Sequence, residues 1–268
     1  MNSSATPMVL VIGATGSIGR LATAEAIRQG FRTRALVRDA SRAGALADGA
    51  GVVIGDLTQP DSLGAALDGV DAVILTHASD ENETTIEQVS YGGVRNVLAV
   101  LTGRQVRIVL MSAVGVTART GLYNTSHMAD WKRRAERLVR ASGHAYTIVR
   151  PGWFDENLPD QLHLILRQGD RHHAGNPTDG VVARRQIAQV LIACVTSEAA
   201  ERKTFELVAG HGPATTDFDS LFAAVSPDAA GSLDGPGDAN DMPLDIEPEH
   251  VTDDLTAISS SAKHFFPR

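Results

Sequence analysis

The chain has 268 residues, of which 43% are apolar and 21% are charged, and its formal net charge is −8. These values are typical of a globular domain and exclude a disordered or fibrous chain. The acidic balance and the lack of a Lys/Arg run exclude the basic face that nucleic-acid binding needs. No apolar stretch approaches the roughly 18 residues of a membrane span. Because Met1–Pro7 also lacks the pattern of a signal peptide, we expect a cytoplasmic protein with no membrane partner.

Short apolar runs alternate with longer amphipathic segments up to Val149. The runs predict strands and the segments predict helices. The expected strands are Met8–Ile12, Thr33–Val37, Gly51–Ile54, Asp71–Thr76, Val106–Ser112 and Tyr146–Val149, and the expected helices are Ile18–Gln29, Ser62–Leu67, Thr84–Leu101 and Ala129–Ala141. Such alternation predicts right-handed βαβ units, and near-continuous apolar strands suit a sheet covered on both faces. We therefore predict a single-domain α/β protein with a Rossmann-type, doubly wound parallel sheet.

The pattern becomes less regular after Pro151. These elements are too few for an independent domain, so residues 153–225 are predicted to form a small C-terminal substrate-side cap on a dinucleotide-binding core of residues 8–152. The expected elements of the cap are helices over Leu158–Arg167, Arg184–Thr196 and Asp217–Val225, a strand over Thr204–Val208, and a His/Gly-rich loop.

The rest of the chain, residues 226–268, is expected to be a linker and a C-terminal segment. From Ser226 to Glu249 the sequence is rich in Gly, Pro and Asp, which is typical of a linker. Val251–Ser259 predicts a short closing helix. Cys194 lies within the apolar run 190–195, so we expect a buried core cysteine rather than a redox-active one.

The strongest functional signal is a glycine-rich turn between the first strand and the first helix. Gly13 permits a tight turn, Gly16 lets a diphosphate approach the backbone, and Gly19 lets the helix pack on the strand. The free N–H groups at the start of the helix then face the diphosphate. We expect a nicotinamide dinucleotide to bind at Gly13, Thr15, Gly16, Ser17, Ile18 and Gly19.

The end of the second strand bears on the choice between NADP(H) and NAD(H). Proteins that select NAD usually place an acid here against the ribose hydroxyls, but this chain has Arg38 followed by Asp39. A guanidinium matches a 2′-phosphate with several donors, and Arg42 lies four residues further on. NADP(H) is therefore favoured over NAD(H). The alternative is a solvated arginine, with Asp39 binding the ribose of NAD.

Polar residues follow the third and fourth strands as well. Asp56 is placed to meet the adenine amino group, and Leu57 to pack on the ring. Thr76 and His77 end the fourth strand, beside the expected nicotinamide ribose. An Asp after a strand is also a common turn residue, so a structural role is the alternative reading of Asp56.

Several motifs in this order resemble those of an atypical short-chain dehydrogenase/reductase, with the NAD(P)H-binding, NmrA-like group as the nearest match. The resemblance covers about residues 8 to 210. The matching motifs are Gly13-Ala14-Thr15-Gly16-Ser17-Ile18-Gly19, Leu36-Val37-Arg38-Asp39, Gly55-Asp56-Leu57, Tyr91-Gly92-Gly93-Val94-Arg95-Asn96-Val97 and Tyr146-Thr147-Ile148-Val149-Arg150-Pro151-Gly152.

The resemblance implies catalytic and cofactor roles, with one departure. Active relatives use a Tyr-x-x-x-Lys pair, and Lys132 fits the lysine, but Met128 occupies the tyrosine position. A thioether cannot donate a proton, so the usual alcohol dehydrogenase machinery is missing. Ser112 resembles the serine that polarises a substrate carbonyl, and Lys132 also fits a ligand of the nicotinamide ribose. Tyr123 is out of phase with Lys132 on a helix, although a loop could deliver its hydroxyl.

The segment after the sixth strand is where such relatives line the nicotinamide and substrate pocket. Pro151 is expected beside the nicotinamide, and Trp153 and Phe154 are expected to give the substrate pocket an apolar wall, with core packing as the alternative. Tyr123 is assigned to the same pocket. His172 and His173 are adjacent and would point apart in an extended chain, so we predict no catalytic metal.

Three functions fit these features. The leading hypothesis is an NADPH-dependent oxidoreductase that reduces a small carbonyl, quinone or conjugated substrate by direct hydride transfer, because such acceptors tolerate the loss of a strong acid. A non-catalytic NADP(H)-binding redox sensor acting through a protein partner is the second. A sugar-nucleotide epimerase is the third, and it too would need the absent tyrosine. The sequence allows a homodimer but does not fix the oligomeric state.

Overall fold

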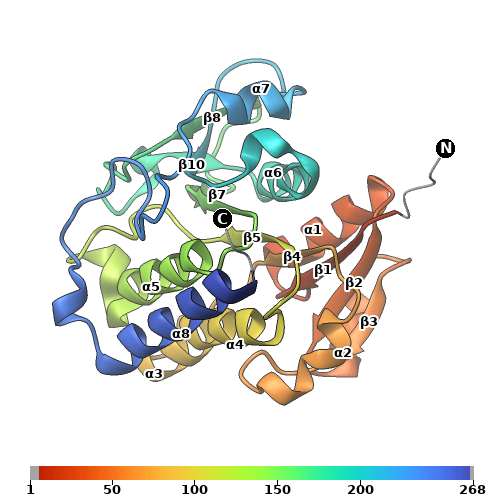
Figure 1. Cartoon of the computed structure of the whole chain (residues 1–268). Coiled ribbons are helices and arrows are strands. Elements are labelled where there is room, and N and C mark those ends of the chain that lie inside the picture. The colour runs from red at the N-terminus through yellow and green to blue at the C-terminus, as the bar shows by residue number, and fades with distance from the viewer. Residues whose placement is uncertain (1–5, 266–268) are drawn as a thin grey trace.

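The computed structural model describes residues 6–265, and its centre is one large β-sheet (Figure 1). The strand order is β3-β2-β1-β4-β5-β6-β10-β8, and all neighbours are parallel except β10 and β8. The chain order reverses between β1 and β4, so the expected ligand site lies at the carboxyl ends of these strands. The strands are β1 Met8–Ile12, β2 Arg32–Val37, β3 Gly51–Ile54, β4 Ala72–Leu75, β5 Arg107–Met111, β6 Tyr146–Pro151, β8 His163–Arg167 and β10 Lys203–Gly210, and β7 Trp153–Phe154 pairs separately with β9 Val181–Val182.

Helices cover both faces of the sheet because side chains alternate along each strand. In β1, Val9 and Val11 pack in a cluster with α1 and α6, whereas Leu10 and Ile12 pack in a second cluster with α2, α4, α5 and α8. Figure 1 shows α1 and α6 together on one side of the sheet, and α4, α5 and α8 on the other. The helices are α1 Ser17–Arg28, α2 Gly64–Leu67, α3 Glu83–Ile86, α4 Gly93–Val100, α5 Met128–Ala141, α6 Arg184–Thr196, α7 Phe218–Ala223 and α8 Glu249–Phe265.

The predicted Rossmann-type sheet is confirmed, and the ends of the strands and helices predicted up to Val149 lie within two residues of those observed. The predicted helix Thr84–Leu101 is interrupted in one respect. Between α3 and α4 the chain forms a π-helical turn over Glu87–Gly92. Such turns are uncommon and often occur at functional sites. Cys194, as expected, is fully buried, and burial raises the pKa of its thiol to about 12.

The expected helix over Leu158–Arg167 is wrong, because its second half is strand β8. Leu164 and Leu166 face the cluster around α6, and they lie opposite Ala209 and Leu207 of β10. Their spacing of two residues is the strand signal that the helical interpretation missed. Residues 153–225 therefore supply two strands of the main sheet, and α6, which packs on α1, as well as loops.

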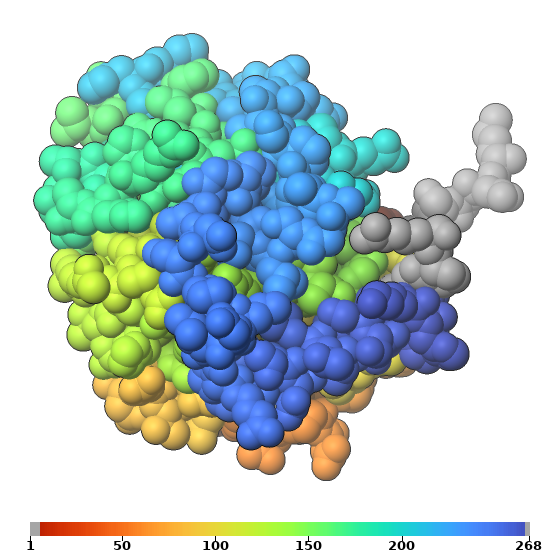
Figure 2. Space-filling view, turned by 60° about the vertical axis from the view of Figure 1, so that its left-hand side comes forward, coloured from red at the N-terminus to blue at the C-terminus, as the bar shows by residue number. Residues whose placement is uncertain are grey.

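Ion pairs hold the Gly/Pro/Asp-rich segment after Ser226 against the body. The fully buried Arg133 of α5 pairs with Asp234 at 3.0 Å, and the fully buried Arg150 of β6 pairs with Asp238 at 2.7 Å. In Figure 2 the C-terminal part, in blue, forms a continuous band across one face of the molecule. The segment is thus tied to the fold, and the predicted closing helix is the longer α8. Within residues 6–265, no helix is long and apolar enough to cross a membrane.

Candidate functional site

The turn from β1 into α1 is tight, and its glycines explain how it forms. Gly13 has a φ of +82°, and a Cβ there would lie 2.8 Å from the backbone nitrogen of His77. A Cβ on Gly19 would lie 2.0 Å from the Gly13 carbonyl oxygen, so any side chain at Gly19 would push the helix off the turn. Gly13 therefore brings β1 close to the end of β4, and Gly19 keeps α1 against the turn rather than lining the cavity.

The start of α1 opens into a cavity of about 470 Å³ at the carboxyl ends of the strands. Thr15, Gly16, Ser17 and Ile18, the residues expected to bind a diphosphate, line this cavity. Gly16 is the N-cap of α1, and its position has no side-chain cap. The N–H groups of the first turn and the positive end of the helix dipole are thus available to an anion. This arrangement fits a dinucleotide diphosphate.

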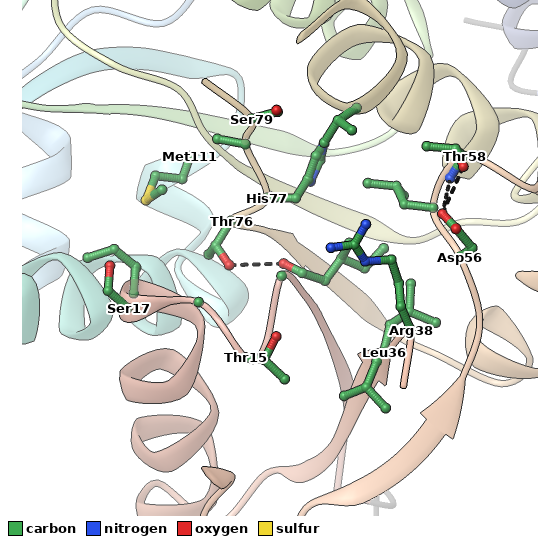
Figure 3. Close-up of a pocket in the computed structure, with 18 of the residues that line it drawn as sticks. Thr15, Ser17, Leu36, Arg38, Asp56, Thr58, Thr76, His77, Ser79 and Met111 are labelled. Atoms are coloured by element: carbon green, nitrogen blue, oxygen red, sulfur yellow. Dashed lines mark hydrogen bonds between the residues drawn. The ribbon is translucent and has the colours of Figure 1, made fainter. Parts of the chain in front are cut away.

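The other end of the cavity carries two cations and a carboxylate. Figure 3 shows the Arg38 side chain reaching into the cavity, with Asp56 and Thr58 beyond it. Arg42 also lines the cavity, and within residues 6–265 neither guanidinium forms an ion pair. Asp39, by contrast, accepts the Ser41 backbone N–H at 2.8 Å, which lowers its pKa and uses the carboxylate locally. Free cations at this position suit a 2′-phosphate.

Two further sets of residues complete the wall. Thr76 donates its hydroxyl to the Ile12 carbonyl at 2.9 Å, and His77 lies beside it (Figure 3). Residues that the sequence reasoning missed lie on the segment after β4 and on the helix that follows. The only signal for them was their place after the carboxyl end of a central strand. They are Asp80, Glu81, Thr85 and Val89.

Lys132 and Ser112 lie next to this cavity rather than in its wall. They line a separate space of about 10 Å³ together with Ser90, His77 and Met111, and the last two border both spaces. Within residues 6–265, no hydrogen-bond partner meets the buried Ser112 and Ser90 hydroxyls or the Nδ1 atom of His77. These groups therefore surround a space of roughly the size of one water molecule.

Charge in this small space is costly. Burial lowers the pKa of the Lys132 ammonium, although the carboxylate of Glu136 opposes that effect. Burial and the nearby Lys132 charge together lower the pKa of His77 to about 3, so the imidazole is neutral near pH 7. A neutral ring offers one donor and one acceptor nitrogen.

A second, mainly apolar hollow of about 360 Å³ adjoins the first cavity. Tyr123, Pro151, Trp153 and Phe154 line it, so the three residues predicted for a substrate pocket come together there. Pro151, predicted to lie beside the nicotinamide, lines this hollow. Phe154 borders both the hollow and the dinucleotide cavity, so a molecule in the hollow lies beside that cavity.

The loop wall of the hollow is held by a buried carboxylate that the sequence reasoning missed. Asp170 accepts the backbone N–H of Gly115 at 2.7 Å and of Thr117 at 2.8 Å. This fixes the loop after β5, whose residues Ala113 and Val114 also line the hollow. Among residues 6–265, no three His, Cys, Asp or Glu side chains group closely enough to hold a metal ion.

The fold and this cavity define a Rossmann-type protein that binds a nicotinamide dinucleotide. The cavity has an uncapped helix start and a tight glycine turn at one end, and two arginines at the other. The chain belongs to the NAD(P)H-binding family, whose sequence pattern matches residues 13–198. The resemblance to atypical short-chain dehydrogenases/reductases is thereby confirmed.

Individual relatives differ in what they are named for. The chain is 29% identical to sanguinarine reductase of Eschscholzia californica, covering 84% of this chain and 98% of that protein. It is 26% identical to photosystem II assembly factor Ycf39 of Synechocystis, covering 81% and 67%. An NAD-dependent epimerase/dehydratase homologue from Bacillus halodurans has a similar fold, with a TM-score of 0.66, 24% identity and coverage of 77% and 96%.

Proposed function

We propose that this protein is an NADPH-dependent oxidoreductase that reduces a small carbonyl, quinone or otherwise conjugated substrate by direct hydride transfer. The observation that carries the proposal is the position of Phe154, which borders both the dinucleotide cavity and the aromatic hollow. NADP(H), when bound, supplies the hydride at its nicotinamide ring. The reductase named among the relatives supports the same class of reaction.

The cofactor preference rests on charge. Arg38 and Arg42 offer donors that a 2′-phosphate would accept, whereas Asp39 is occupied by the N–H of Ser41. At the opposite side, the uncapped first turn of α1 holds the diphosphate. The chain would thus hold the dinucleotide at its adenosine 2′-phosphate and at its central diphosphate, which leaves the nicotinamide half to occupy the part of the cavity that Phe154 borders.

The hollow holds the substrate, and its residues offer no ready acid. Tyr123 already donates its hydroxyl to Asp179 at 2.7 Å, and Ser112 and Lys132 line the neighbouring small space. A conjugated acceptor suits such a site because the charge left by hydride addition can reside on a remote oxygen that takes its proton from solvent. The chain's own contribution is therefore positioning, with little general acid catalysis.

The test is steady-state oxidation of NADPH and NADH with a quinone, an enone and an aldehyde. We expect turnover with the quinone or enone, faster with NADPH than with NADH, and little with the aldehyde. Gly16→Val, which should lose cofactor binding, is the control for trace contaminating reductases. No turnover with any acceptor would overturn the proposal.

One observation favours a second function, a redox sensor without catalysis. Ser112 and Lys132 are directed to a small separate space, and one relative is named as an assembly factor. A sensor should bind NADPH and NADP⁺ with different affinities and show no turnover with the acceptor panel. Calorimetric titration with both cofactor forms, beside the turnover assay, distinguishes the two functions.

A further inference from the structure

Arg184 is the one charged residue among the described residues that line the hollow. It is the first residue of α6, and it lines the hollow together with Trp153 and Phe154. Its guanidinium carbon lies 5.2 Å from the centroid of the Phe154 ring. The cation is thus packed beside the one aromatic residue that borders both the hollow and the dinucleotide cavity.

The hydrogen bonds of Arg184 leave one buried donor unused. Asp155 accepts the backbone N–H of Arg184 at 2.8 Å and also pairs with Nη1 of its guanidinium. The Nε–H, by contrast, is buried and has no acceptor among the described residues 6–265. The guanidinium donors are therefore only partly satisfied within the described residues, and an anionic acceptor at Arg184 would gain a charge-assisted hydrogen bond.

Asp155 only partly cancels this positive charge. Its side chain is 49% exposed and that of Arg184 is 36% exposed, so water screens their attraction. The positive end of the α6 dipole lies at the same place and favours an anion. An oxygen anion inside the hollow would meet the accessible part of the Arg184 guanidinium, where Asp155 and solvent leave its charge only partly neutralised.

From these observations we infer that the hollow selects planar aromatic acceptors that carry an anionic oxygen substituent, a carboxylate or a sulfonate, bound by Arg184. The inference rests on the proposed reductase function and names its substrate class. The aromatic ring system lies against Trp153 and Phe154, which supply apolar contact, and the substituent pairs with the Arg184 guanidinium. A volume of about 360 Å³ suits a molecule of a few fused rings.

The experiment compares a neutral and an anionic acceptor on the same ring system, 1,4-naphthoquinone and 1,4-naphthoquinone-2-sulfonate. The measured quantity is the ratio of kcat/KM for the sulfonate to that for the neutral quinone, relative to the same ratio in the unmodified protein. Differences in intrinsic reactivity cancel in this comparison. We expect Arg184→Met to lower the relative ratio about ten- to a hundredfold, the usual range for a charge-assisted hydrogen bond.

Arg185→Met is the matched control, because Arg185 is the next residue, is exposed and loses the same charge. It should leave the ratio unchanged within about twofold. Asp155→Asn should raise the ratio, since it removes the carboxylate that competes for Arg184. An unchanged ratio in Arg184→Met, or an equal fall in Arg185→Met, would overturn the inference.

A binding measurement separates failure of this inference from failure of the proposed function. Quenching of tryptophan fluorescence by the sulfonate, in protein saturated with NADP⁺ and with Trp131→Phe so that Trp153 is the emitter, reports occupation of the hollow without turnover. Absent turnover together with sulfonate binding that Arg184→Met weakens would refute the reductase and retain the anion site. Turnover of the neutral quinone with no effect of Arg184→Met on sulfonate binding would retain the reductase and refute the anion site.

Discussion

The hydroxyl of Tyr123 donates a hydrogen bond to the Asp179 carboxylate over 2.7 Å. The same oxygen accepts the indole N–H of Trp153 over 2.9 Å, so one hydroxyl links a carboxylate to the aromatic wall of the hollow. Asp179 is itself held by the backbone N–H groups of Ala174 and Gly175. Burial and the bond to Asp179 raise the pKa of Tyr123, which makes it a positioning residue for Trp153 rather than an acid.

Tyr123→Phe tests this assignment. Removing the hydroxyl leaves the Trp153 N–H without its acceptor, at a cost of about 1 to 3 kcal/mol in stability. We expect a lower melting temperature, a higher KM and a kcat reduced by less than about tenfold. Loss of a general acid would instead lower kcat by roughly a hundredfold or more. Steady-state kinetics with the quinone distinguish the two, and a large fall in kcat at unchanged KM would show that Tyr123 is catalytic.

Gly16→Val should abolish dinucleotide binding and leave the protein folded. Gly16 has a φ of −73°, which any residue can adopt, and a Cβ there would come within 3.1 Å only of the Gly13 carbonyl oxygen. The branched side chain would occupy the space of the diphosphate. Calorimetric titration with NADPH measures the loss. Gly64→Val, at a position with open space around it, is the control, and unchanged affinity in Gly16→Val would contradict the assignment of this turn.

Arg38→Ala should weaken NADPH binding much more than NADH binding. Only NADPH carries the 2′-phosphate, and a charge-assisted hydrogen bond contributes about 1.5 to 3 kcal/mol, or about ten- to a hundredfold in affinity. Arg32→Ala removes an exposed guanidinium from the start of the same strand, outside the cavity, and should change neither affinity. Equal losses for both cofactors would remove Arg38 from the 2′-phosphate site and would return Asp39 to consideration as a ribose ligand.

Glu206 on β10 should make stability fall as the pH rises. Burial raises the pKa of its carboxyl to about 7, although Arg150 lies 3.6 Å away. Between pH about 4.5 and 7 the unfolded chain loses this proton while the folded chain keeps it, so folding becomes less favourable. The resulting loss of unfolding free energy is complete above pH 7. It is about 3 kcal/mol at most, because one pKa unit corresponds to about 1.4 kcal/mol.

Glu206→Gln removes this titration while keeping the size of the side chain. Thermal unfolding of the variant and of the unmodified protein should therefore agree near pH 4.5, and the variant should be the more stable at pH 8. Glu201→Gln changes an exposed carboxylate paired with Arg107 and serves as control. A difference between Glu206→Gln and the unmodified protein that does not change with pH would show that Glu206 is ionised in the folded state.

An element could be predicted from the sequence when its signal lies within one short segment of the chain. The strands β1 and β5 were predictable because their apolar runs are continuous, and the glycine turn because its spacing lies within one short segment. β8 was not, since alternation over His163–Arg167 is short and competes with a helical interpretation. Its place is decided by pairing with β10, which lies far along the chain.

Long-range contacts explain what else the sequence left undecided. Nothing in the sequence near Asp234 indicates that it meets Arg133 of α5, about a hundred residues away. The composition of the segment after Ser226 therefore predicted a linker, whereas ion pairs hold the segment against the body of the protein. Likewise, Lys132 was placed correctly on a helix, but the small space that it shares with Ser90 depends on the π-helical turn.

Met128 occupies the position at which the family resemblance leads us to expect the tyrosine of a Tyr-x-x-x-Lys pair. It lies one turn before Lys132, but it is half-buried and packs against the hydrophobic cluster that contains Tyr91 and Trp131. It is not among the residues that line the dinucleotide cavity or the aromatic hollow. A phenol at this position would therefore lie in the packing between α5 and its neighbours rather than beside the substrate.

Met128→Tyr should accordingly destabilise the protein without adding activity. A larger ring in a packed site costs about 1 to 3 kcal/mol, and a phenolic hydroxyl without a partner adds a similar amount. Met128→Leu nearly conserves the volume and should cost less than about 1.5 kcal/mol, which separates loss of fit from loss of the thioether. Thermal unfolding and turnover with ketones and alcohols measure both effects. Gain of ketone reduction or alcohol oxidation in Met128→Tyr would show instead that the phenol reaches the substrate, and that Lys132, one turn away, acts beside it.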